Sequence, residues 1–166
     1  MPALSLRLGL VAGLAVTALA ALPPSAMAHE AHHGDLRIAH PFATPTPPGA
    51  PNGAAYLDIG VEGEQPARLI GASSPVSEVV ELHDMTLEDD RMVMRRQEAF
   101  EIAPGETLTM RPGGGTHLML INLEAPLTVG QRFPLTLEFA ERDSVEVEVW
   151  VEEASVGSEA ADAHHH

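Results

Sequence analysis

Apolar and polar residues alternate along most of the chain with the period of two that is typical of β-strands. In residues 144–151 every second residue is valine, and two glutamates and a tryptophan lie between the valines. A strand with this pattern buries one face and exposes the other. Similar short segments, rich in Val, Leu and Ile and bounded by turn residues, predict strands at 36–39, 54–61, 67–72, 76–85, 92–96, 107–110, 117–123 and 132–139.

Eight or nine short strands at this spacing predict an all-β fold, an antiparallel β-sandwich or barrel. No ten-residue segment after residue 28 combines a helical period with caps, and no internal repeat is visible. Residues 40–53 contain five prolines and two glycines, so we expect an extended surface loop there.

The two ends of the chain differ from the middle. Arg7, an apolar run at 8–22 and the small-x-small pattern of Ala26-Met27-Ala28 predict a secretory signal peptide over residues 1–28. We therefore expect an exported, soluble protein in a bacterial periplasm, with no membrane span in its mature form. We expect residues 29–35 to form a mobile His-rich arm and residues 36–152 to form a β-domain. Residues 153–166 are expected to be a disordered acidic tail that ends in histidines.

Charge and cysteine content exclude several classes of function. Without residues 1–28 the chain has eight arginines, no lysine and 24 acidic residues, a net charge of −16 with neutral histidines. Such a surface argues against nucleic acid and anionic membranes as partners. The sequence has no cysteine, which excludes disulfides, a lipid-modified cysteine and the His₂Cys site of a blue-copper electron carrier.

One pair of predicted strands brings histidine and methionine together. The chain turns after the strand that carries His83 and returns through Met94. A two-residue turn centred on Glu88-Asp89 makes His83 face Met94. The next pair toward the turn is then Met85 opposite Met92. Side chains directly opposite each other in an antiparallel pair have Cβ atoms about 4.5–5.5 Å apart, so an imidazole and a thioether there can share one ion.

A second His–Met pair follows in a later strand. His117 and Met119 are two residues apart and therefore share a strand face. With His83 and Met94 they make two imidazoles and two thioethers, a soft ligand set that suits Cu(I) far better than Mg, Ca or Mn. The alternative is that these are ordinary core methionines and surface histidines. Strand parity favours the metal site, because both histidines alternate with the apolar residues that are expected to face the core.

The spacing resembles that of the periplasmic copper chaperones called PCuAC, whose signature is His-x10-Met-x21-His-x-Met. Ten residues separate His83 from Met94, as in the signature, and twenty-two separate Met94 from His117. An extra residue in the glycine run at 113–115 accounts for the difference. The resemblance starts in the Pro-rich segment 45–56 and ends near residue 151.

The resemblance implies a cupredoxin-like β-sandwich that carries Cu(I) and performs no catalysis. It implies delivery to the copper-bearing subunit of cytochrome c oxidase, alongside a thioredoxin-like copper assembly factor. A storage or resistance protein that sequesters copper without a dedicated recipient is the main alternative. A metalloenzyme with an N-terminal histidine brace is a further alternative, but the chain lacks an evident aromatic substrate platform. A metal-free scaffold would leave the His/Met pattern unexplained.

The His-rich N-terminus is a candidate secondary metal site. Signal cleavage after residue 28 exposes the amine of His29, which can chelate Cu(II) together with its own imidazole. His32 and His33 could complete a nitrogen-rich set, and the terminal histidines 164–166 could join it. The alternative is a solvated arm that collects metal without a defined geometry.

Overall fold

The computed structural model describes residues 30–163, which form eleven β-strands and one helix. In chain order the elements are β1 (Glu30–His33), β2 (Leu36–Ala43), β3 (Asn52–Val61), β4 (Ala67–Ser73), β5 (Ser77–Glu88), β6 (Arg91–Gln97), β7 (Phe100–Ile102), β8 (Thr107–Thr109), β9 (His117–Leu123), β10 (Arg132–Phe139), β11 (Val145–Val151) and α1 (Ala154–Asp162).

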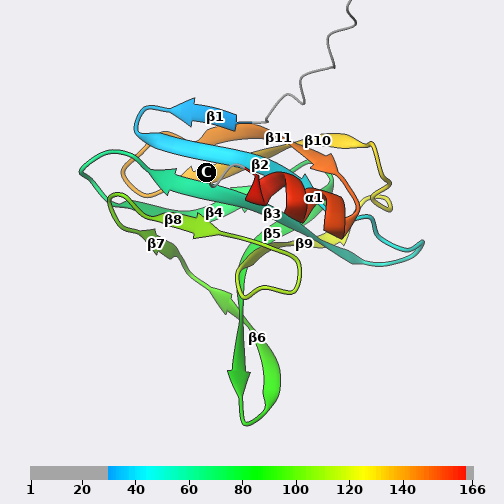
Figure 1. Ribbon diagram of the computed structural model, residues 1–166. Helices are drawn as coiled ribbons and strands as arrows, with labels where there is room; N and C mark the ends of the chain where they lie inside the picture. The colour runs from blue at the N-terminus through cyan, green and yellow to red at the C-terminus, as the bar shows by residue number, and fades with distance from the viewer. Residues whose placement is uncertain (1–29, 164–166) are drawn as a thin grey trace, which may run out of the picture.

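Seven of these strands close into a barrel. Each strand is hydrogen-bonded to the next in the order β2-β11-β10-β4-β5-β9-β3, and β3 pairs with β2 to complete the ring. Every pairing in the ring is antiparallel except that of β11 with β2. The remaining strands lie outside this ring: β1 pairs with β2, β6 with β5, β7 with β4 and β8 with β3 (Figure 1). The predicted all-β sandwich or barrel is confirmed.

The barrel interior is filled by the alternate apolar residues that the sequence pattern marks. All four valines of β11 are at most 6% exposed, and Leu118 and Leu120 of β9 are fully buried. On β5 the inward residues are Val80 and Leu82. Because successive side chains of a strand point to opposite faces, the residues between these lie on the outer surface of the barrel.

The segment after β11 is helical, so the prediction of a disordered tail over 153–166 is wrong for its described part. Helix α1 packs on the outer face of β2, where a Cβ on Gly157 would overlap the ring of Phe42 (Figure 1). The helix has no side-chain N-cap and no acidic residue in its first turn. It lacks the usual sequence signals, and its stability comes from packing against the barrel. Among the described residues no helix is long and apolar enough to cross a membrane.

Two further predictions about local structure are corrected. The His-rich arm was predicted to be mobile, but residues 30–33 form β1, which pairs with β2 through a tight turn at Gly34 (φ 64°). The predicted loop at 40–53 is shorter, because β2 continues to Ala43 past an irregularity at His40 (φ 42°). His40 is buried, and its Nε2 lies 3.0 Å from Oε2 of Glu152.

Strands β5 and β6 form a hairpin that extends away from the barrel (Figure 1). The two central residues of its turn are Asp89 and Asp90, both with positive φ (49° and 61°). This is the geometry of a type I′ turn, which matches the twist of the flanking strands. The predicted turn at Glu88-Asp89 is therefore wrong by one residue, and the predicted strand register is wrong by two.

Candidate metal site

The predicted ligands lie on one face of three adjacent strands, β9, β5 and β6. His83 of β5 is directly opposite His117 of β9, and the centroids of their rings are 5.7 Å apart. Their strand neighbours Leu82 and Leu118 point into the barrel. The two imidazoles therefore meet on the outer surface, at the base of the hairpin.

The surroundings of His83 leave one ring nitrogen free for a ligand bond. Its Nε2 lies 2.8 Å from Oε2 of Glu81, two residues earlier on the same face. Its Nδ1 is buried and has no hydrogen-bond partner within the described part of the chain. Because a carboxylate only accepts hydrogen bonds, Glu81 favours the tautomer with the proton on Nε2 and a lone pair on Nδ1. A carboxylate behind a ligating histidine is a common arrangement at metal sites.

His117 is the more deeply buried of the two imidazoles, at 5% exposure. Its Nδ1 lies 3.3 Å from the carbonyl oxygen of Gly115, which assigns the proton to Nδ1 and the lone pair to Nε2. Burial lowers the pKa of His117, and the neighbouring His83 lowers it further, against the opposing effects of Gly115 and Asp84. The ring is consequently neutral at pH 7, the form that binds a metal ion.

The two methionines occupy opposite ends of this face. Met119 is half-buried, lies two residues from His117 and is opposite Glu81. Met94 is 43% exposed and is opposite Met85. Across two strand spacings of about 4.8 Å and four residues of about 3.3 Å, Met119 and Met94 are about 16 Å apart in a flat sheet. His83 and Met94 are diagonal neighbours.

The predicted pairing of His83 with Met94 is therefore corrected. His83 faces Arg96, and Met85 faces Met94 in place of Met92. The face on which these side chains lie is unchanged, because a shift of two residues preserves strand parity. His83, His117 and Met119 are grouped on β5 and β9, whereas Met94 approaches from the hairpin.

The glycine loop before β9 fits closely against β5. The carbonyl oxygen of Gly115 accepts a hydrogen bond of 2.9 Å from the backbone N–H of Met85. A Cβ on Gly115 would lie 2.9 Å from Oδ1 of Asp84, so a larger residue there would require the Asp84 side chain to move. With this loop in place His117 remains in register with His83.

A buried ion pair fixes the start of this loop. Arg111 donates two hydrogen bonds to Asp58 of β3, of 2.6 and 2.9 Å, and a third of 3.0 Å to Asp162 of α1. Asp58 is 1% exposed. Arg111 thus joins the barrel wall, the helix and the loop that leads to His117. On the same outer face Tyr56 lies 6.5 Å from His117, measured between ring centroids.

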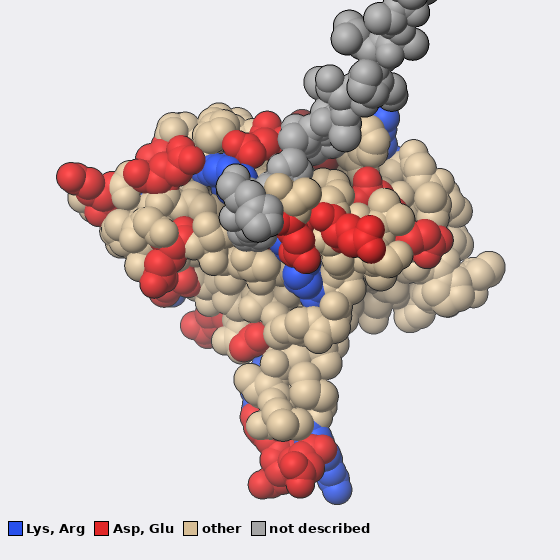
Figure 2. Space-filling model, viewed as in Figure 1, with Lys and Arg blue, Asp and Glu red and all other residues tan. Residues whose placement is uncertain are grey.

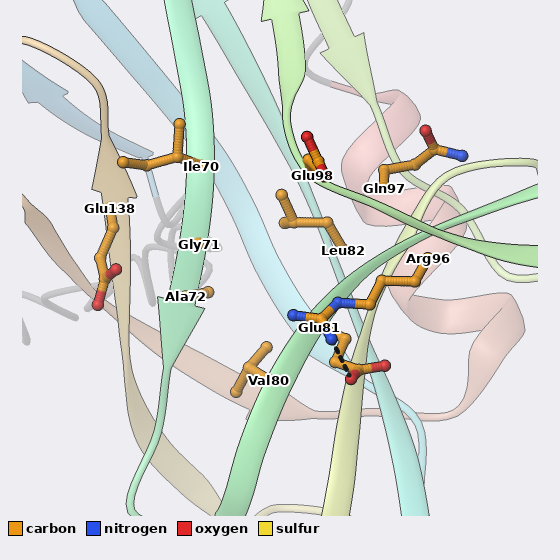
Figure 3. Close-up of a pocket in the computed structure, with 10 residues that line it drawn as sticks. All are labelled: Ile70, Gly71, Ala72, Val80, Glu81, Leu82, Arg96, Gln97, Glu98 and Glu138. Carbon is orange, nitrogen blue, oxygen red and sulfur yellow. Dashed lines mark ion pairs between the residues drawn. The ribbon is translucent and has the colours of Figure 1, made fainter.

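A cavity of about 620 Å³ adjoins the site on the other side of Glu81. It opens where β4 and β5 separate beyond their single paired position, Ala72 with Val80 (Figure 3). Within it Oε1 of Glu81 lies 3.3 Å from a guanidinium nitrogen of Arg96, so the carboxylate joins Arg96 to His83. The Arg96 side chain of this pair is 71% exposed, whereas Nδ1 of His83 is buried.

The secondary site proposed at the N-terminus is not assembled in the described part. His29 lies outside the described residues. His32 and His33 are successive residues of β1 and so point to opposite faces of the strand. His32 also lies 2.7 Å from Glu30. Residues 30–163 contain no group of three or more His, Cys, Asp or Glu side chains that could hold a metal ion.

Acidic side chains form several groups on the face shown in Figure 2, one of them at the tip of the hairpin. The whole sequence has a formal net charge of −15.

The sequence prediction missed Glu81 and Arg111 as parts of the site. Glu81 carried a signal, since a carboxylate two residues from a histidine shares its strand face. The pairing of Arg111 with Asp58 had no local signal in the sequence, because the two residues are 53 positions apart.

Sequence comparison finds relatives across most of the β-domain. The family described as "Putative lipoprotein LpqE-like" matches residues 36–151. "Putative lipoprotein Lxx21020" of Leifsonia xyli subsp. xyli (strain CTCB07) is 34% identical over 107 residues, which are 64% of this chain and 64% of that protein. The chain thus matches just under two-thirds of the length of that relative.

Structural comparison finds solved copper proteins of the same fold. A structure described as a copper-bound PCuAC domain from PmoF2 aligns with a TM-score of 0.64 and 26% identity, over 75% of this chain and 98% of that domain. The solution structure of CuI-DR1885 from Deinococcus radiodurans aligns with a TM-score of 0.50 and 27% identity, over 68% of this chain and 76% of that one. The resemblance to PCuAC domains that the sequence predicts is confirmed.

Proposed function

The chain belongs to the LpqE-like family, and from that premise we propose that it is an exported copper carrier that binds Cu(I) through histidine and methionine. The observation that carries the proposal is the pair of imidazoles on β5 and β9. His83 and His117 are opposite each other, and each has one nitrogen satisfied by a neighbouring acceptor. Their remaining nitrogens are available to one ion between the rings.

The choice of Cu(I) rests on the ligand types. Met119 adds a thioether beside His117, and Met94, diagonal to His83, supplies a second when the hairpin bends toward the barrel. Imidazole with thioether suits Cu(I), whereas Mg, Ca and Mn prefer oxygen ligands. The copper-bound PmoF2 domain and CuI-DR1885 share the fold, which supports the same cargo here. The chain contains no thiol that an oxidising compartment could convert to a disulfide.

A carrier must also release its cargo, and the site has features that favour release. Met94 is 43% exposed, and it lies on a hairpin joined to the barrel through one of its two strands. A ligand on such an element is displaced more easily than one in a closed site. We propose a copper centre such as that of cytochrome c oxidase as the recipient. Sequestration without a recipient is the alternative.

The proposed location is the periplasm. It is supported by the signal-like sequence of residues 1–28, which lie outside the described part, and by the exported character that the family's description suggests. A role for His29, His32 and His33 in Cu(II) binding stays a separate prediction. Since His32 and His33 face opposite ways on β1, such binding would need β1 to detach from β2.

The experiment that tests the proposal is a copper-transfer assay under anaerobic, reducing conditions. Protein loaded with Cu(I) is mixed with a metal-free copper-bearing oxidase domain, and copper on each protein is measured after rapid separation. A carrier transfers its copper faster than copper passes through free solution. Transfer only at the rate of spontaneous dissociation would favour sequestration. A higher affinity for Zn(II) than for Cu(I) at His83 and His117 would contradict the assignment of the metal.

A further inference from the structure

We propose that Met85, Met92 and Met94 form a second Cu(I) site made of thioethers alone, on the β5–β6 hairpin. This proposal rests on the proposed function, because copper reaches or leaves the two-histidine site through it. Met94 belongs to both sites in turn. Copper thus passes between an outer station on the hairpin and an inner station at His83 and His117.

The strand register brings the three thioethers together. Met85 is directly opposite Met94, which gives Cβ atoms about 4.5–5.5 Å apart. Met92 is two residues from Met94 on the same strand face, about 6.6 Å along the strand, and is diagonal to Met85. Three flexible side chains at these separations can converge on one soft ion.

Exposure argues that packing does not explain these methionines. Met92 is 55% exposed and Met94 43% exposed, and the hairpin extends away from the barrel (Figure 1). By contrast Met110 is fully buried in the core, as expected for a methionine that fills a gap. Large apolar side chains on a projecting hairpin cost solubility unless something binds them.

Charge around the outer station also favours a cation. The turn at the tip carries Asp89 and Asp90, and acidic atoms dominate that end of the hairpin (Figure 2). The register assigns Glu88, Arg91 and Arg95 to the face opposite the methionines, and Arg96 to the methionine face, where it is paired with Glu81. Arg95 is paired with Glu88 through hydrogen bonds of 2.9 and 2.7 Å, which directs its charge away from the thioethers.

The distance across the sheet gives the second site a role. Met94 is about 16 Å from Met119 in a flat sheet, so the two thioethers do not hold the same ion unless the hairpin bends toward the barrel. Met94 lies beside Met85 and Met92 and diagonal to His83. It is therefore placed to hand an ion from one station to the other. The all-thioether station lacks imidazoles and is expected to bind more weakly.

The test is an anaerobic Cu(I) titration of the full chain against a chromophoric chelator, with the double variant Met85→Leu/Met92→Leu. Wild type should bind a tight equivalent and a second, weaker one. The double variant should lose the second equivalent and keep the first. Leucine preserves the volume and the apolar character of methionine, and Met92 lies on the surface, so the single variant Met92→Leu serves if the double variant is unstable.

Two controls separate this proposal from the proposed function. Met110→Leu, a buried methionine far from copper in the proposal, should leave both equivalents unchanged. His83→Ala/His117→Ala should lose the tight equivalent and keep the weak one. A second equivalent that survives Met85→Leu/Met92→Leu, or a wild type that binds only the tight one, overturns the second site alone. A wild type with no tight equivalent overturns the proposed function.

A redox-stable probe gives an independent readout. Ag(I) replaces Cu(I) as a soft monovalent ion, and the methyl resonances of ¹³C-labelled methionine report which sulfur atoms bind it. The resonances of Met85 and Met92 should shift only with the second equivalent, while that of Met119 should shift with the first. Simultaneous shifts of all these resonances with the first equivalent would show a single mixed site and contradict two stations.

Discussion

At the scale of single residues, the site depends on which nitrogen of each imidazole carries its proton. Glu81 accepts from Nε2 of His83, and the Gly115 carbonyl accepts from Nδ1 of His117. The nitrogen left for a metal ion is therefore Nδ1 on His83 and Nε2 on His117. The two acceptors thus select the tautomer of each ring before an ion binds.

Replacing Glu81 should weaken copper binding without removing a ligand. In Glu81→Ala the carboxylate no longer orients His83, and we expect Cu(I) affinity to fall about 10- to 100-fold, the usual range for such partners. Glu81→Gln keeps an acceptor oxygen and should lose less. Chelator competition measures the affinity. Glu78→Ala, on the same strand but bonded to Asn122, is the matched control. Equal affinities for Glu81→Ala and the control would exclude the orienting role.

The buried His117 should make the metal-free protein sensitive to acid. Its pKa is lowered in the folded state, chiefly by burial, so the unfolded chain binds more protons between the two pKa values. The contribution to stability is complete above the unfolded pKa of about 6.5 and is lost as the pH falls through the folded value. Urea unfolding of wild type and His117→Gln from about pH 7.5 to about pH 5 should show a steeper decline for wild type. His32→Gln, at an exposed position, should resemble wild type. Identical slopes for wild type and His117→Gln would contradict this.

At the scale of elements, the loop from Arg111 to His117 is positioned by the ion pairs that Arg111 makes with Asp58 of β3 and Asp162 of α1. Asp58 is 1% exposed, and Arg111 is its bidentate partner. Removing one member of a buried pair leaves an uncompensated charge, which is strongly destabilising. The hydrogen bond from Arg111 to Asp162 also links the loop to α1, whose own sequence provides no N-cap.

We expect Arg111→Ala to lower the free energy of unfolding by about 3–5 kcal/mol, the usual cost of breaking a buried ion pair. Arg68→Ala breaks the exposed pair with Glu101 and should cost about 0–1 kcal/mol. Chemical denaturation of the two variants gives the comparison. Similar losses for both would mean that the Arg111–Asp58 pair does not hold the loop.

The elements also show how far the sequence could predict this structure. Short Val-, Leu- and Ile-bearing segments between turn residues identified nine of the eleven strands, and the period-two pattern is clearest in β11, which has one buried face. The hairpin register was missed because Glu88-Asp89 and Asp89-Asp90 are similar turn sequences, and only aspartate's tolerance of positive φ at both central positions selects the second. Helix α1 was missed because its packing on Phe42 leaves no local signal. The strand face on which the candidate ligands lie was predicted correctly, because a register shift of two residues leaves every side chain on the same face of its strand.

At the scale of the whole molecule, the β5–β6 hairpin extends from the closed barrel into solvent. The two histidines lie where the hairpin joins the barrel, and Met85, Met92 and Met94 continue along the hairpin. The surface is acidic, with 24 acidic residues against nine arginines and no lysine. A recipient with a basic surface near its copper centre would be favoured, and salt should slow the encounter.

The measurement that tests the central claim most directly is a Cu(I) competition titration of wild type beside His83→Ala/Met119→Ala. Wild type should bind one tight Cu(I) per chain, and the double variant should lose it while keeping its fold, because both side chains lie outside the barrel core. His32→Ala serves as a histidine control on β1 and should keep the tight equivalent. Tight binding that persists in the double variant, or is absent from wild type, would contradict a copper site on β5 and β9.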